Sequence, residues 1–219
     1  MLSAENLEAI RAEGQRLLER ARTDLARSVP QYPAWDMAGL ATHIGGVHAR
    51  MTLICNERPT ERPSVPRPPD GVDLLEWCQG NLEEMLATFI ESDPDTTVWG
   101  FWPDYNLGFW ERRMVIETGL HRWDADQAFD AAGPLPDLVA VTGLSEYPDM
   151  WLHRLGDVPA IEVVADDHGL SWLYGVGIPE ATVSGPASDI YLRLMSRPSP
   201  VEFPTAWATA VDALEPPPR

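Results

Sequence analysis

The sequence predicts an α-helical domain, arranged as an antiparallel four-helix bundle, followed by a small C-terminal α+β domain. Between residues 3 and 129, four segments carry apolar residues at the i, i+3, i+4 spacing of amphipathic helices. From Gly156 onward, apolar and polar residues alternate instead, as they do in β-strands. Glu117 and His121 lie four residues apart among apolar residues of the fourth segment. That placement is typical of polar groups directed into the interior of a bundle.

The first two helices are expected at residues 3–28 and 36–57. Ser3 and Asp36 are suitable N-cap residues, because their side chains can accept hydrogen bonds from the backbone N–H groups of a first helical turn. The glycine pair at 45–46 lowers the helix propensity of the second segment by about 1 kcal/mol per residue relative to alanine. This pair therefore indicates close approach by another backbone or by a ligand.

A proline-rich loop, a third helix and an aromatic loop follow. Residues 58–70 contain five prolines and are too stiff for a helix or a central strand. Asp70 is the expected cap of the third helix, which continues to about Phe89. The loop at 92–106 either covers a pocket or plugs the end of the bundle with its four aromatic residues. These are Trp99, Phe101, Trp102 and Tyr105.

The boundary between the two domains is expected after residue 155. Residues 1–155 then contain the bundle and a fifth helical segment at 135–155, which follows a Gly-Pro break. Residues 156–219 form the α+β domain. Its expected strands and helix lie at 159–165, 171–174, 181–183 and 184–195.

Composition excludes several classes of partner. The formal net charge of −18 and the pI near 4.5 repel phosphate backbones and anionic membranes, so nucleic acid is not an expected partner. There is no apolar run long enough to cross a bilayer and no signal-peptide pattern at the start, so we expect a cytoplasmic protein. Cys55 and Cys78 lie in helical segments and are expected to be buried free thiols.

His43, Glu117 and His121 form the candidate site. Two neutral imidazoles and one carboxylate suit a borderline divalent ion such as zinc, and a metal would also make a buried Glu117 tolerable. The spacing alone also fits other arrangements. Glu117 could form a surface ion pair with Arg113 or Arg122, and His43 could be a hydrogen-bonded histidine of the core.

Three segments resemble the mycothiol-dependent maleylpyruvate isomerase family of DinB-like metalloproteins. They are Trp35–His43, Glu117–Asp126 and Ser184–Asp189, in the order of that family. The resemblance covers nearly the whole chain. It implies a four-helix metal-binding bundle followed by a small α+β domain. It also implies a divalent metal, usually zinc, on His43, Glu117 and His121, and mycothiol as cosubstrate.

The implied reaction uses a thiolate. A metal-bound thiol loses its proton readily, and the thiolate adds to the cis double bond of maleylpyruvate, permits rotation and leaves to give fumarylpyruvate. Asp124, three residues after His121, is a candidate to accept an imidazole N–H, or else a solvent-facing acid paired with Arg122.

Two arginines near the end of the last expected helix are candidates for substrate binding. Arg197 occupies a place where the family carries an arginine, and it could hold a substrate carboxylate or simply balance surface acids. Arg193, one turn earlier, is the alternative anion- or cosubstrate-binding residue. Arg193 and Ser196 also interrupt the apolar pattern of this helix. The electrophile therefore stays open, as do thiol S-transfer, metal-dependent hydrolysis and non-catalytic binding of a small molecule. Monomer and homodimer are both open.

Overall fold

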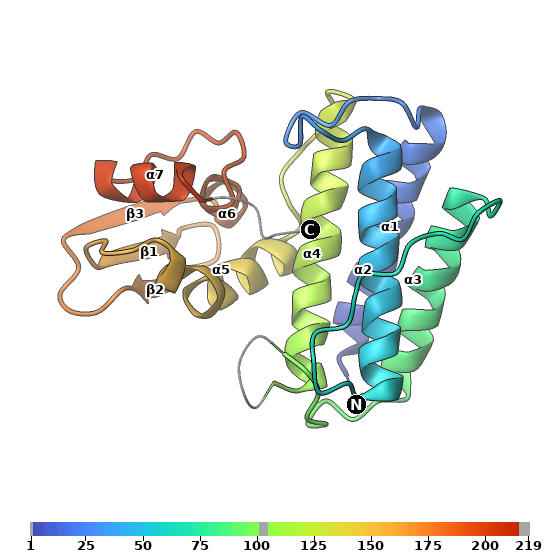
Figure 1. The fold of residues 1–219 in the computed structure, drawn as a ribbon. Coiled ribbons are helices and arrows are strands. Elements are labelled where there is room, and N and C mark those ends of the chain that lie inside the picture. Colours follow the sequence, from blue (N-terminus) through green and yellow to red (C-terminus); the bar gives the residue numbers. More distant parts are fainter. Residues whose placement is uncertain (1, 101–104, 215–219) are drawn as a thin grey trace. The chain divides into compact units, whose positions relative to one another are not determined.

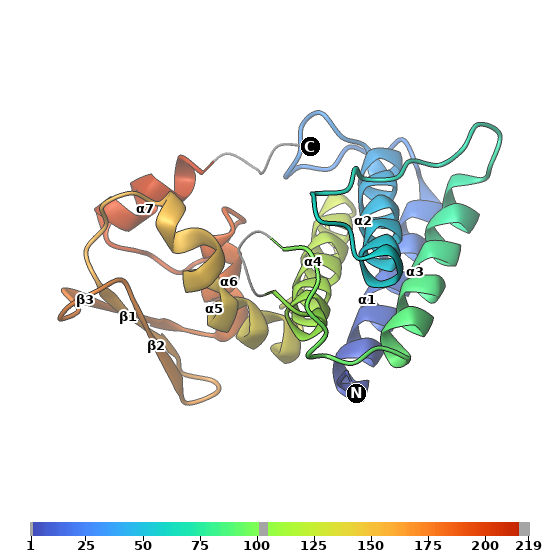
Figure 2. The ribbon, with the colours of Figure 1, turned by 60° about the horizontal axis from the view of Figure 1, so that its bottom comes forward.

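The computed structural model describes residues 2–100 and 105–214, whose helices and strands are shown in Figures 1 and 2. The chain divides into two compact units between Gly133 and Pro134. Within the described residues, every helix is too short or too polar to serve as a membrane span.

The described residues of the first unit form four helices. They are α1 (Ala4–Thr23), α2 (Met37–Glu57), α3 (Leu74–Ile90) and α4 (Leu107–Ala128). Both α1 and α2 pack against α3 and α4, so the four helices enclose one apolar core. This arrangement confirms the predicted helical bundle.

Each bundle helix begins at a polar N-cap that accepts hydrogen bonds from the first turn. The caps are Ser3, Asp36, Asp73 and Asn106. The first two are the predicted caps. The third helix begins later than predicted, at Asp73 rather than Asp70, because the residue after Asp70 has a left-handed φ of 80° that a helix cannot continue.

The first helix ends at Thr23, five residues before its predicted end at residue 28. The chain after it pairs with the start of α2 instead of continuing as a helix. The N–H groups of Met37 and Ala38 donate to the carbonyl oxygens of Arg27 and Leu25, at 2.8 and 2.9 Å. These bonds satisfy two of the free donors at the start of α2.

The glycine pair of α2 lies where the loop at 58–73 and α3 press against the helix. A Cβ added to Gly46 would lie 2.6 Å from the carbonyl oxygen of Pro66, and one added to Gly45 would lie 2.7 Å from the Sγ atom of Cys78. The predicted close approach of another backbone is confirmed at Gly46. Figure 1 shows this loop running back along the bundle beside α2.

The described part of the aromatic loop packs against the start of α4. The rings of Trp99 and Trp110 stack at 5.8 Å, and Trp110 Nε1 donates to the Trp99 carbonyl oxygen at 2.7 Å. Tyr105 stacks on Phe109 at 4.0 Å. Of the two alternatives that the sequence left open, these contacts favour the plug over the lid. Phe101 and Trp102 lie outside the described residues.

Cys55 and Cys78 are free, buried thiols, as predicted. Burial raises the pKa of each thiol to about 12, so both stay protonated at neutral pH. Cys78 donates to the carbonyl oxygen of Ala41 at 3.1 Å. Both thiols therefore act as small apolar groups of the core.

The second unit contains a sheet of three strands among the described residues, in the order β2-β1-β3. β1 (Ile161–Ala165) pairs antiparallel with β2 (Leu170–Tyr174) and parallel with β3 (Ala181–Gly185). Alternate residues of β1 are buried, as the alternating sequence predicts. The predicted small α+β domain is confirmed.

The fifth helix belongs to this second unit, so the units divide earlier than the predicted boundary after residue 155. α5 (Asp137–Trp151), followed by the short 3-10 helix η1 (Leu152–Arg154), packs against α6 (Ala187–Leu194) and β2. Tyr174 donates its hydroxyl to the Leu144 carbonyl oxygen at 2.7 Å. Helical spacing alone cannot tell which core a helix covers, because an apolar stripe fits either one.

One helix was not predicted. α7 (Thr205–Asp212) lies in the proline-rich C-terminal segment and is anchored by Trp207, which is fully buried. Trp207 Nε1 donates to the carbonyl oxygen of Pro159 at 2.8 Å. The short length of the segment hid its helical periodicity.

Candidate metal centre

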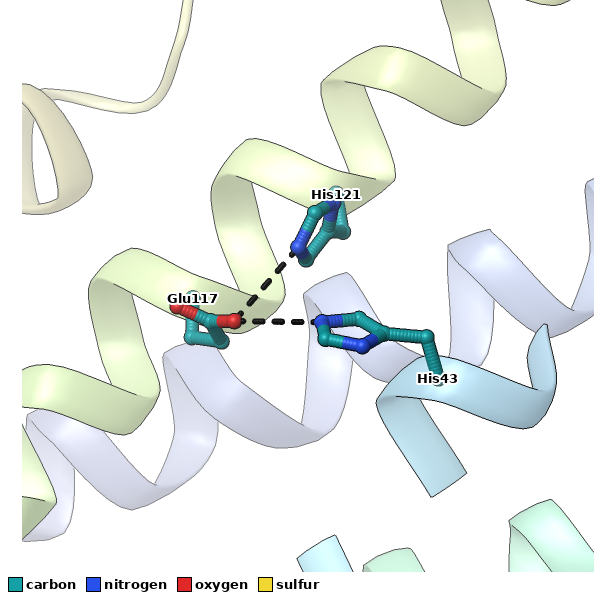
Figure 3. Close-up of side chains that lie close together, drawn as sticks. All are labelled: His43, Glu117 and His121. Atoms are coloured by element: carbon teal, nitrogen blue, oxygen red, sulfur yellow. Dashed lines mark hydrogen bonds and ion pairs between the residues drawn. The ribbon is translucent and has the colours of Figure 1, made fainter. Parts of the chain in front are cut away.

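Three side chains from two helices of the bundle converge on one point (Figure 3). His43 comes from α2, and Glu117 and His121 come from α4, one helical turn apart. One ligand atom of each residue lies within 4.8 Å of the other two. Glu117 Oε1 is 3.3 Å from Nε2 of His43 and 3.5 Å from Nε2 of His121. Two imidazole nitrogens and a carboxylate oxygen fit a divalent ion such as zinc, with further positions free for water or substrate.

The two oxygens of Glu117 have different partners. Oε2 accepts a hydrogen bond from Nη2 of Arg113 at 2.8 Å, one turn earlier on α4, whereas Oε1 faces the two histidines. The alternative of an ion pair with Arg113 is therefore present, but it occupies only one oxygen and the arginine is buried. Arg122, the other alternative partner, pairs elsewhere.

The electrostatics of the cluster keep Glu117 ionised. Burial alone would raise the pKa of Glu117, but hydrogen bonds from the two histidines and the charge of Arg113 hold it well below its usual range. Burial alone would lower the pKa of His121, but Tyr32 and the two adjacent carboxylates raise it to about 10. Burial is the main reason why the pKa of His43 is lowered. Without metal, a protonated His121 thus supplies the positive charge beside Glu117, and a divalent cation would displace that proton.

Asp124 orients the His121 ring. Its side chain is fully buried, and Oδ2 lies 3.0 Å from Nδ1 of His121. Because Nδ1–H donates to this carboxylate, Nε2 is the nitrogen that faces Glu117 and His43. Asp124 is therefore not the solvent-facing acid of the alternative interpretation.

We expect Asp124→Asn to weaken metal binding without unfolding the protein. Loss of the charged acceptor should reduce ligand basicity and loosen the ring, which costs about 10- to 100-fold in metal affinity at comparable sites. Competition with a chelating dye measures this affinity. Asp130→Asn, at an exposed acid just beyond α4, is the matched control, and equal affinities of the two variants would contradict the role of Asp124.

Two aromatic residues of the loop between α1 and α2 also line the cluster. The Trp35 ring lies 5.1 Å from the His43 ring, and the Tyr32 ring lies 5.8 Å from the His121 ring. The two aromatic rings contact each other at 4.6 Å. Sequence reasoning gave Tyr32 no role. Its position could have indicated a role in the site, because it lies in a short loop between two prolines, just before the helix that carries His43.

The remaining charged residues of the 117–126 block tie α4 to α1. Arg122 is buried and donates to Glu13 through Nε and to Asp126 through Nη1. Asp126 also accepts from Arg20 at 2.6 Å. The block thus has two faces, one that carries the candidate ligands and one that holds a buried ion-pair network.

Arg193 and Arg197 belong to the second unit. Arg193 forms a two-pronged ion pair with Asp212, at 2.7 and 3.2 Å. Arg197 is buried and donates to the carbonyl oxygen of Met195 at 2.7 Å. Ser196, which follows the C-cap residue Met195 of α6, has a left-handed φ of 59°, and the N–H of Arg197 donates to the Leu192 carbonyl oxygen at 2.8 Å. Binding of substrate or cosubstrate by these arginines stays a prediction.

The fold and the cluster define a class of protein. A four-helix bundle that directs two imidazoles and a carboxylate from its second and fourth helices to one interior point is typical of helical-bundle metalloproteins. Residues 7–126 match the model of the mycothiol maleylpyruvate isomerase N-terminal domain, so the chain belongs to this family. The resemblance predicted from the three sequence segments is confirmed.

Solved structures of mycothiol-dependent maleylpyruvate isomerase have a similar fold. One crystal structure is 14% identical and aligns with a TM-score of 0.69. A second, of a histidine-to-alanine mutant, is 13% identical with a TM-score of 0.70. Each match covers 91% of this chain and 94% of the other chain. No curated protein matches the chain.

Proposed function

We propose that this protein is a metal- and mycothiol-dependent enzyme that attacks a small electrophile with a thiolate, as an isomerase or an S-transferase. The observation that carries the proposal is the convergence of His43, Glu117 and His121 within a bundle of the maleylpyruvate isomerase family. The named structural relatives catalyse their isomerisation with mycothiol. The finer assignment to this chain rests on the chemistry of the cluster.

The residues of the cluster have separable roles in this proposal. His43, Glu117 and His121 would hold a divalent ion, which would supply the positive charge that lowers the pKa of a bound thiol. Asp124 keeps the proton of His121 on Nδ1, so that Nε2 stays directed at the centre. Arg113 neutralises the outer oxygen of Glu117. Tyr32 and Trp35 place aromatic rings beside His121 and His43.

The proposed thiolate reaction needs no oxidant, reductant or further co-reactant. With a cis-enoyl acid, the sulfur forms a bond to one alkene carbon, and the double bond becomes a single bond that can rotate. Elimination breaks the same carbon–sulfur bond and restores the alkene in the trans form, so the thiolate is recovered. With an alkylating electrophile, the leaving group departs instead and the thioether is the product.

The test is an assay of zinc-loaded protein with mycothiol against cis-enoyl acids and alkylating electrophiles. We expect turnover that requires both metal and thiol and that is lost in His43→Ala. Activity that persists when the thiol is omitted would contradict the proposal and indicate a hydrolase that activates water. Tight binding of electrophiles without turnover would indicate a binding protein.

A further inference from the structure

A buried arginine with an unsatisfied nitrogen, as far as the described residues show, lies on the helix that carries His43. Arg50 is only 8% exposed, yet its Nε atom has no hydrogen-bond partner. Among residues 2–100 and 105–214, its guanidinium forms no ion pair within 4.0 Å of a carboxylate. The other buried arginines of the first unit are paired: Arg113 with Glu117, and Arg122 with Glu13 and Asp126.

Such an arrangement is costly unless an anion completes it. Burying the Nε–H group of a guanidinium without an acceptor loses a hydrogen bond to water that no residue of the described chain replaces. The chain has 34 acidic residues against 16 basic ones, so carboxylates are abundant, yet none within residues 2–100 and 105–214 forms an ion pair with Arg50. The missing partner is therefore a specific feature of this position.

Arg50 lies on the same side of α2 as the candidate metal centre. It follows His43 by seven residues, which is two helical turns and about 10 Å along the helix axis. An extended arginine side chain can cover much of that distance. The charges of Glu117 and of Arg62 both act on Arg50.

Arg62 brings a second positive charge to Arg50. It is exposed on the loop at 58–73, which runs back along α2 and contacts that helix at Gly46. No carboxylate in the described chain forms an ion pair with Arg62. The two arginines repel each other, and an anion between them would remove the repulsion.

We propose that Arg50, assisted by Arg62, binds a carboxylate of the electrophilic substrate while its reacting carbon faces the metal centre. This inference rests on the proposed function and assigns the residues that would recognise a carboxylate of its substrate. The planar fork of Arg50 matches a carboxylate with two parallel hydrogen bonds. In a protein with a net charge of −18, a local pair of arginines also offsets the repulsion that an anionic substrate meets.

The test measures binding of maleate, a small cis-dicarboxylate, to zinc-loaded protein by calorimetry. We expect Arg50→Met to weaken binding about tenfold or more, because a charge-assisted hydrogen bond to a buried group is lost. Arg67→Met removes a positive charge from an exposed position of the loop at 58–73 and should leave the affinity nearly unchanged. Equal affinities in the Arg50 and Arg67 variants would overturn the inference.

Thermal unfolding gives a second readout. Without ligand, Arg50→Met should melt at the same temperature as the wild type or higher, because an unpaired buried charge is removed. Maleate should raise the melting temperature of the wild type but not of this variant. If Arg50→Met does not fold, Arg62→Met, at an exposed position, should weaken maleate binding in the same direction by a smaller factor.

Metal content separates this inference from the proposed function. One outcome would overturn the inference alone. The protein would bind metal and be active with thiol, but Arg50→Met would not change its affinity for maleate. The opposite outcome would be a protein that holds no metal but binds maleate in an Arg50-dependent way. That result would contradict the proposed function and still support the anion site.

Discussion

Replacing His121 with alanine is expected to abolish metal binding, where the wild-type chain should hold about one divalent ion. His121 supplies one of three converging ligand atoms, all within 4.8 Å of one another. With only His43 and Glu117 left, the loss in affinity should exceed the 10- to 100-fold expected for a change at a residue that only orients a ligand. Elemental analysis of protein expressed with zinc, and chelator competition, measure the effect. His43→Ala should behave in the same way.

His48→Ala is the matched control for these variants. His48 lies on α2, is buried, and contacts the Thr118 hydroxyl at 3.0 Å instead of the cluster. Burial lowers its pKa to about 3, so it is neutral and adds no charge near the site at neutral pH. This variant should keep its metal. Metal retained by His121→Ala, or lost equally from His48→Ala, would remove the basis of the proposed chemistry.

Replacing Arg122 with alanine is expected to destabilise the bundle by about 3–5 kcal/mol, the range found when one partner of a buried ion pair is removed. Arg122 is 2% exposed and lies between the buried carboxylates of Glu13 and Asp126. Without it, the two buried carboxylates keep only the more exposed Arg16 and Arg20 as ion-pair partners among the described residues. Urea unfolding followed by far-UV circular dichroism measures the change.

Arg16→Ala removes a charge from the rim of the same network. The Arg16 side chain is 53% exposed and pairs with Asp126 at 3.4 Å, so solvent screens the interaction. We expect a loss below about 1 kcal/mol. Similar unfolding midpoints for the Arg16 and Arg122 variants would mean that the buried network contributes little to stability.

Local patterns predicted the helices of the bundle well and their ends less well. The caps Ser3 and Asp36 were visible because an N-cap depends on a few neighbouring residues. The end of α1 was missed because backbone bonds to Met37 and Ala38, distant in sequence, compete with continuation of the helix. Placement of the fifth helix failed for a related reason, since an apolar stripe does not reveal which core it covers.

The sequence was also sufficient to predict the candidate metal ligands, but not the residues that contact them. Helical periodicity put Glu117 and His121 on one face, and three matching segments pointed to the family. The same block could not reveal that Asp124 serves His121 whereas Arg122 serves Glu13 on another helix. Those pairings depend on how α4 is rotated against α1.

Residues three or four positions apart therefore determined the helices, their caps and the pair on α4, because such neighbours interact in any helix that forms. Tertiary packing determined the contacts between residues that are far apart in the sequence. His43 meets Glu117 across 74 positions of the chain, Glu13 meets Arg122 across 109, and the Nε atom of Arg50 has no hydrogen-bond partner among the described residues. Only the folded chain brings such side chains within a few ångströms, where desolvation and charge decide which of them are paired.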